Sequence, residues 1–260
     1  MIPMWKFTDT EFWTLWRDRT EEFLPEPLFY TSRIESHVMH NEEMARIRAS
    51  LPEITRSDFR EVLDCIQVPD IRIEVRGWNG KNELEAKGRL SLLAARRGSR
   101  GVLVSQEPGE TLIHAAGFTV EECDAIALAT AVVNSLPTAE RGQREDFSLP
   151  IADSRVQLDY DFGKSPVSDD TNKSAYTTSA SFMSAPAVRI GTIEIIQGRS
   201  VYGPRGITRH HIEWRDIEGD GRYTISDENP RRVTSMDAKR LTILINTKIA
   251  AVVSAIKDER

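Results

Sequence analysis

The sequence has little cysteine, no long apolar run and no excess of basic residues. Its two cysteines among 260 residues, Cys65 and Cys123, do not stand at the spacing of a metal site. We expect two free thiols, although the spacing leaves a disulfide between them open. No run approaches the roughly 18 apolar residues that span a bilayer, and the first residues lack the basic start and apolar stretch of a signal peptide. These absences predict a cytoplasmic protein without membrane insertion.

Acidic residues outnumber basic ones. Asp and Glu total 40 and Lys and Arg total 34, which gives a net charge of −6 at pH 7. Because phosphate binding requires a basic surface, this balance argues against a nucleic-acid partner. Hydrophobic residues make up 40% and charged residues 28% of the chain, a composition typical of globular proteins.

Catalytic motifs are absent as well. The sequence has no GxSxG nucleophile elbow, no cysteine with a nearby catalytic histidine and no GxxxxGK[ST] phosphate loop. No set of residues assembles an active site or a cofactor site. We therefore predict a protein that is not an enzyme and uses no cofactor.

One acidic segment resembles a calcium loop but lacks its context. Residues 216–227 place acidic side chains at positions 1, 3, 5 and 12 of such a loop, with glycine at position 6. The segment before it alternates like a strand, whereas a calcium loop needs an incoming helix. Asp220-Gly221 is also a common hairpin dipeptide. We predict a hairpin turn here and no calcium.

The histidines give no metal site either. His37 and His40 stand one helical turn apart, but no cysteine or further histidine lies nearby to complete a zinc site. His210 and His211 are adjacent on an expected strand, so their side chains point to opposite faces. We predict no metal.

The first half of the sequence begins with helices. Thr8 and Glu11 stand at the capping-box spacing, so we predict a helix that Pro25 ends. Residues 37–66 are helical in pattern, with a break near Pro52. A helical start is therefore expected ahead of the first sheet.

Alternating residues after position 70 predict that sheet. Ile71, Ile73 and Val75 alternate with charged residues, which is typical of a half-buried strand, and a turn is expected at 77–80. Short connections favour an antiparallel meander. Its further strands are expected at about 89–95, 101–105 and 111–115.

A helix is expected after this meander. Thr119 and Glu122 repeat the capping-box spacing, and Pro137 closes the helix. Its expected buried stripe comprises Cys123, Ile126, Ala127, Thr130 and Val133.

The second half begins with a polar tract. Residues 159–184 are rich in Ser, Thr and Asp, and we predict a long loop there. Strands are then expected at 188–197, 207–216 and 222–226. Residues 234–237 cap a final amphipathic helix whose apolar residues follow a 3.6-residue period.

The two halves repeat one plan. Val188-Arg189-Ile190 restates Ile71-Arg72-Ile73, and Thr234 follows Thr119 at nearly the same offset. We predict an α+β fold of two pseudo-two-fold related halves, each an antiparallel β-sheet followed by an amphipathic helix packed on the sheet. The halves are expected to comprise residues 1–146 and 147–260 within one compact unit.

Several blocks resemble one known family. Residues 214–223, which read Trp-Arg-Asp-Ile-Glu-Gly-Asp-Gly-Arg-Tyr, are similar to the Asp-Gly-Arg-Tyr block of the EspG family of ESX, or type VII, secretion systems of mycobacteria and related actinobacteria. Weaker blocks follow the family's order along nearly the whole chain. They are Glu11 to Trp16, Leu24 to Leu28, Leu136-Pro137 with Gly142, Phe147 to Pro150, and Val233-Thr234 with Asp237.

The resemblance implies a cytosolic chaperone. Such a protein binds the PPE subunit of a PE–PPE heterodimer at its helical tip, keeps the pair soluble and directs it to secretion. Covering an exposed apolar tip prevents self-association. A structural homodimer without a secreted client and an unrecognised metal-binding enzyme stay as alternatives, and a homodimer of the free chaperone stays open.

The partner surface is expected on the edge and face of the second sheet. Arg209, His211 and Glu213 share one strand face, opposite Ile212 and Trp214, which leaves a polar face open. Strand alternation gives the predicted partner-binding residues as Val188, Ile190, Thr192, Glu194, Ile196, Arg209, His211 and Glu213.

Overall fold

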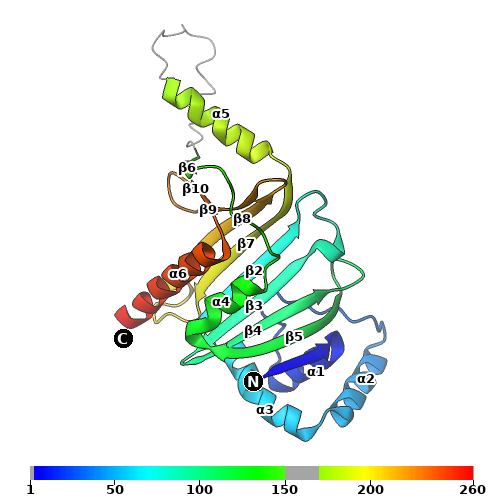
Figure 1. Cartoon of the computed structure of the whole chain (residues 1–260). Helices are drawn as coiled ribbons and strands as arrows, with labels where there is room; N and C mark the ends of the chain where they lie inside the picture. The colour runs from blue at the N-terminus through cyan, green and yellow to red at the C-terminus, as the bar shows by residue number, and fades with distance from the viewer. Residues whose placement is uncertain (1–2, 150–169, 260) are drawn as a thin grey trace.

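The strands form one continuous antiparallel sheet. A computed structural model describes residues 3–149 and 170–259, and within them ten strands pair in the order β1-β5-β4-β3-β2-β7-β8-β9-β10-β6 (Figure 1). The strands are β1 (Met4–Thr8), β2 (Ile71–Asn79), β3 (Leu90–Arg97), β4 (Arg100–Pro108), β5 (Ala115–Asp124), β6 (Phe147–Ser148), β7 (Ala187–Gln197), β8 (Arg209–Ile217), β9 (Gly221–Ser226) and β10 (Arg232–Ser235).

Helices lie on both faces of this sheet (Figure 1). In the described part of the chain the α-helices are α1 (Asp9–Arg19), α2 (His37–Ser50), α3 (Glu53–Gln67), α4 (Leu128–Asn134), α5 (Asp170–Ser184) and α6 (Ala238–Asp258). Single 3-10 turns occur at η1 (Ala86–Gly88), η2 (Ala125–Ala127) and η3 (Pro204–Gly206). None of the described helices is long and apolar enough to cross a membrane. The predicted α+β class is confirmed.

The two halves join through β2 and β7. These strands pair antiparallel from Ile71 opposite Gln197 to Asn79 opposite Arg189. On either side of this junction a four-strand meander is followed by one helix, β2 to β5 by α4 and β7 to β10 by α6. The order is what a two-fold repeat would produce, while the pseudo-two-fold relation and the division at residue 146 stay predictions.

One face of the sheet is covered by α4 and α6. Ile73, Ile193 and Trp214 on three neighbouring strands pack with Val132 of α4 and Ile245 of α6 in one buried cluster. Burial of aliphatic side chains on this scale is the main favourable term for the fold. This face is therefore apolar across the junction between the halves.

The opposite face is covered at its two ends, first over the first meander. There α1 and α3 pack on β3, β4 and β5, with Phe12 of α1 stacked on Phe118 of β5 at a ring-centroid distance of 4.4 Å. The predicted capping box opens α1, because Thr8 accepts from the Glu11 backbone and Glu11 accepts from the Thr8 backbone. The break near Pro52 between α2 and α3 is likewise confirmed.

The far end of the same face is covered by α5. Phe182 of α5 is fully buried against Phe147 and Tyr223, at ring-centroid distances of 5.5 and 5.2 Å. Figure 1 shows α5 projecting beyond the sheet from this contact. A strip over β2, β7 and β8 is left between the two helical covers.

The segment that carries the family resemblance fixes the β8–β9 hairpin to the connection between the halves. Arg222 donates to both carboxylate oxygens of Asp216, at 2.7 and 2.8 Å, and to the carbonyl oxygen of Pro137 at 2.7 Å. Tyr223 donates to Asp220, and the Arg144 backbone donates to the Tyr223 hydroxyl at 2.9 Å. We call these contacts the hairpin clamp.

Gly77 lies inside a strand, so the turn predicted at 77–80 is wrong for its first three residues. β2 continues to Asn79, and Gly77 faces Gly191 of β7 in register. A Cβ at Gly191 would lie 2.5 Å from the indole nitrogen of Trp214, and one at Gly77 would lie 3.1 Å from its ring. The two glycines make room for the buried Trp214 and do not turn the chain.

The predictions for residues 111–127 are also wrong, whereas the end of the expected helix is present as α4. Residues 111–114 belong to a turn, and β5 begins at Ala115 and takes in Thr119, which pairs with β1 and β4. Hydrogen bonds on both sides of β5 outweigh a local capping pattern. The helix is only α4, and Ile126 of the expected buried stripe is 86% exposed.

The second half matches its predictions more closely. The expected Gly219-Asp220-Gly221 turn joins β8 to β9, and α6 buries Leu241, Ile245, Ile249 and Val252. Its N-cap is Asp237, whereas Thr234 lies in β10.

The loop predicted at 159–184 is wrong over residues 170–184, which form α5, and its earlier part lies outside the described residues.

Both cysteines are free, on opposite sides of the sheet, since Cys65 packs with the α1 and α3 cluster and Cys123 with the α4 and α6 cluster.

Candidate functional site

The uncovered strip of the sheet carries a charged groove. The groove has a volume of about 610 Å³ and is formed by the outward side chains of β2, β7 and β8 together with one residue of the segment after α1. We call it the central groove. Its lining residues are Glu26, Arg72, Glu74, Arg76, Thr192, Glu194, Arg209 and His211.

Two glutamates face each other at the centre of this groove. Glu74 of β2 and Glu194 of β7 are direct partners in the antiparallel register. Like charges directly opposite across a strand pair are destabilising. Both carboxylates therefore need positive neighbours.

Arginines on β2 supply the countercharge for Glu74. Arg72 Nε lies 2.9 Å from one carboxylate oxygen of Glu74 and Arg76 Nη2 lies 3.1 Å from the other. Burial nevertheless raises the pKa of Glu74, with Glu194 acting in the same direction and the two arginines against it. Arg76 also forms an ion pair with Glu26, which holds the segment after α1 over the groove.

Side chains of β8 neutralise Glu194. Arg209 Nη1 lies 3.3 Å from Glu194, and His211 Nδ1 lies 3.7 Å from the other carboxylate oxygen, an ion pair when the imidazole is protonated. On its other side, His211 Nε2 lies 3.9 Å from Glu213, which pairs with Arg231 at 2.6 Å. Positive and negative side chains thus alternate along the groove. Its three glutamates are matched in number by its three arginines.

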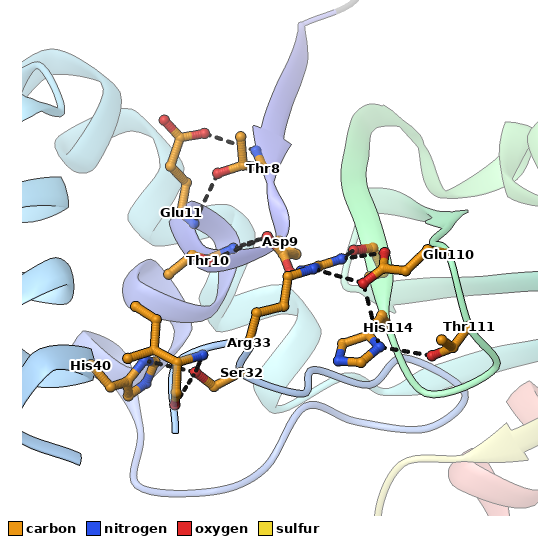
Figure 2. A network of polar contacts seen from close by, with 12 residues as sticks. Thr8, Asp9, Thr10, Glu11, Ser32, Arg33, His40, Glu110, Thr111 and His114 are labelled. Atoms are coloured by element: carbon orange, nitrogen blue, oxygen red, sulfur yellow. Dashed lines mark hydrogen bonds and ion pairs between the residues drawn. The ribbon is translucent and has the colours of Figure 1, made fainter. Parts of the chain in front are cut away.

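A polar network anchors the segment of residues 20–36, which reaches the groove at Glu26 (Figure 2). Arg33 donates to both carboxylate oxygens of Glu110, at 2.9 and 2.8 Å, and to the Ala115 carbonyl at 2.9 Å, and it also pairs with Asp9. Hydrogen bonds from Arg33 lower the pKa of Glu110 to about 2. Figure 2 shows how Arg33 joins the start of α1 to the turn between β4 and β5. The network holds residues 20–36 at one border of the groove.

Four of the predicted partner-binding residues line the groove: Thr192, Glu194, Arg209 and His211. They do not lie at a sheet edge, because β7 and β8 are hydrogen-bonded on both sides. That part of the expectation is wrong, and the interior position of β7 follows from its pairing with β2.

The other four lie apart from the groove lining. Val188 is 46% exposed at the start of β7, and Ile190 packs against the cluster around Phe182. Glu213 pairs with Arg231, and Ile196 is only 1% exposed, so its side chain offers no surface to a partner.

Sequence reasoning missed the half of the groove that β2 contributes. The alternation of Arg72, Glu74 and Arg76 with Ile71, Ile73 and Val75 already places three charges on one face. What the sequence did not show is that β2 pairs with β7, a contact between residues more than a hundred positions apart.

Two of the carboxylates considered for calcium binding, those of Asp216 and Asp220, bind groups of the chain itself. Within residues 3–149 and 170–259, no group of His, Cys, Asp or Glu could hold a metal ion. Asp216 accepts from Arg222, and Asp220 accepts from Tyr223 and from the Gln143 backbone. The hairpin clamp thus uses two of the four carboxylates of the segment that resembled a calcium loop.

Two of the comparisons with known proteins gave matches. The model of the EspG family matches residues 8–246. A chain of the solved structure of the Mycobacterium tuberculosis type VII secretion system chaperone EspG5, in complex with a PE25–PPE41 dimer, is similar over 95% of this chain and 96% of that chain. The TM-score is 0.59 and the identity 12%, so this likeness concerns the fold. No match was found among the curated proteins.

Proposed function

We propose a function from one premise: the chain belongs to the EspG family. The protein is a cytosolic chaperone of a type VII secretion system. It binds a PE–PPE heterodimer through the helical tip of the PPE subunit, keeps the pair soluble and directs it to secretion. This role requires no catalysis and no cofactor.

The observation that carries the proposal is the family match over residues 8–246, and the fold supports it. The similar chaperone EspG5 is described in complex with a PE25–PPE41 dimer. In the present protein both covers of this face end at the strip over β2, β7 and β8, so three neighbouring strands have no helix over them.

We place the client on this strip, over the central groove. A stable interface usually has an apolar centre and a polar rim, whereas the centre of this strip is charged. Exposed apolar groups lie at two borders of the strip, Val188 at the start of β7 and Ile113 in the turn before β5. The ion pairs of Glu74 and Glu194 would remain satisfied beneath a client, because each carboxylate already has its cation within the chain.

Co-expression with the PE–PPE pairs encoded beside the gene, followed by gel filtration, tests the proposal. Wild type should co-elute with one pair as a ternary complex. Thr192→Trp fills the groove with a large side chain and should weaken that complex by at least about tenfold. Thr247→Trp is the matched control, because Thr247 is exposed on α6, on the other face of the sheet, and should bind as wild type does.

Two results would overturn the proposal at different levels. If wild type forms a complex with none of the pairs, the chaperone function is wrong. If Thr192→Trp binds as tightly as Thr247→Trp, the function stands and the client lies elsewhere on the surface.

A further inference from the structure

A second, smaller cavity adjoins the central groove. It has a volume of about 430 Å³ and shares Glu26 and Arg76 with the groove. Its other walls include the apolar side chains of Leu28, Phe29, Leu112 and Ile113. Because its charged residue outside the groove is Arg89, we call it the Arg89 pocket.

Arg89 has no carboxylate partner among the described residues. Its guanidinium lies 4.8 Å from the ring centroid of Phe29, and its hydrogen bond, to the Leu112 carbonyl, is long at 3.4 Å. Arg33 and Arg76, by contrast, each bind two carboxylates. Glu26 lines the pocket, but it is the partner of Arg76.

The surroundings of Arg89 favour an added negative charge. Burial lowers the pKa of Arg89, and the positive charge of Arg76 lowers it further. A half-buried cation beside a like charge is stabilised by any anion that reaches it. Guanidinium binds carboxylates through two parallel hydrogen bonds, and its stacking on an aromatic ring leaves its edge available for them.

The walls select the kind of anion. Five of the nine residues that line the pocket are apolar, which favours an occupant that carries an aliphatic group beside its charge. Glu26 and the net charge of −6 oppose a polyanion such as nucleic acid. A segment that lies in the central groove also reaches this pocket, because the two share Arg76 and Glu26.

We propose that the Arg89 pocket binds an acidic side chain of the client, Asp or Glu next to an aliphatic residue, and so helps to select the client. The client's identity rests on the function proposed above, whereas the carboxylate site itself does not.

The carboxylate site is tested on the free protein with isovalerate, a carboxylate that carries a branched aliphatic group. The Nε signal of Arg89, assigned by its absence in Arg89→Lys, should shift saturably when isovalerate is added. Isovaleramide, the uncharged isostere, should leave it unchanged. If isovalerate gives no saturable shift, or if the amide gives the same one, the inference is wrong whatever the client.

The contribution to client binding is measured on the ternary complex with the PE–PPE pair. Arg89→Gln should weaken binding by about tenfold, and Arg89→Lys by less, because it keeps the charge but not the paired donors. Arg205→Gln is the control, since Arg205 is an exposed arginine of η3 that lines neither cavity.

The two proposals fail in distinguishable ways. If wild type binds the pair and Arg89→Gln binds equally well, client selection by Arg89 is wrong and the chaperone function stands. If wild type binds no pair while isovalerate still shifts Arg89, the chaperone function is wrong and the carboxylate site stands.

Discussion

Replacing Asp216 by Asn should destabilise the protein severely, because it leaves a buried arginine without its countercharge. The side chain of Arg222 is 5% exposed and that of Asp216 is 10% exposed. Asp216 receives two of the hydrogen bonds of Arg222, and the guanidinium lies 5.0 Å from the ring centroid of Trp214, where water cannot replace the carboxylate.

The expected magnitude follows from this burial. Removing one partner of a buried ion pair costs about 3–5 kcal/mol of unfolding free energy. For a chain of this size each kcal/mol lowers the melting temperature by about 2–4 °C, so the expected loss is roughly 6–20 °C. Thermal unfolding followed by circular dichroism, together with urea unfolding, measures both quantities.

Two further variants test whether the loss of stability comes from leaving the buried charge of Arg222 unpaired. Glu43→Gln breaks an ion pair with Arg46 on the surface of α2, where the side chains are 36% and 72% exposed, and should cost less than about 1 kcal/mol. Asp216→Leu combined with Arg222→Met removes both charges and should be more stable than Asp216→Asn. A loss for Asp216→Asn no larger than for Glu43→Gln would refute the reasoning.

Three further predictions concern packing and pH. Gly142→Ala should cost about 1–3 kcal/mol in urea unfolding, because the new Cβ would lie 2.0 Å from the Cζ atom of Tyr223. Phe182→Ala should cost about 3–5 kcal/mol and speed hydrogen exchange in α5 most, because the ring is fully buried. Glu74→Gln should remove a pH dependence. Burial raises the pKa of Glu74 in the folded protein above 4.5. Protonated Glu74 therefore contributes stability below pH 4.5, and this contribution is lost as the pH rises through the pKa of the folded protein. As the pH rises over this range, wild type should lose stability relative to Glu74→Gln.

Each of these predictions has a result that contradicts it. Wild-type stability in Gly142→Ala would mean that the connection between the halves does not pack on Tyr223. Uniform hydrogen exchange in Phe182→Ala would mean that Phe182 does not anchor α5. Parallel stability curves for wild type and Glu74→Gln between about pH 4 and about pH 7 would mean that Glu74 titrates alike in the folded and unfolded chain.

Local signals predicted local structure, and they failed where distant strands decide it. Thr8 and Thr119 carry the same capping pattern, yet only Thr8 caps a helix. Thr119 pairs with Lys6 and Ser105 on the two neighbouring strands. No property of the residues around Thr119 reveals those partners, since hydrogen bonding between strands depends on where the rest of the chain lies.

The glycines of β2 and β7 show the same limit. Gly77 reads as a turn residue next to Trp78 and Asn79. Its use depends on Trp214, which lies across two strands and occupies the space above Gly77 and Gly191. A glycine that admits a large neighbour and a glycine that turns the chain look alike in a single sequence.

On the face of the sheet opposite α4 and α6, the kind of side chain indicates which strands a helix covers. In the first half, β4 and β5 present Val104 and Phe118 to α1 and α3. In the second half, the apolar side chains gather at the far end, where Ile190 of β7, Ile225 of β9 and Val233 of β10 belong to the cluster that α5 covers through Phe182. β7 and β8 present Thr192, Glu194, Arg209 and His211 instead. A buried core under a further helix of this chain would not contain such a set, so the strip is built to meet water or a partner.

Charge balance limits how a client can be selected on that strip. The central groove holds three glutamates and three arginines, which neutralise one another when His211 is uncharged. A charged client gains little there, because every charge that it meets already has a partner. In the Arg89 pocket at the border of the groove, Arg89 has no carboxylate partner among the residues that the structure describes. Electrostatic selection should therefore act at Arg89, and substitutions that keep the groove neutral should change client affinity less than loss of this one charge.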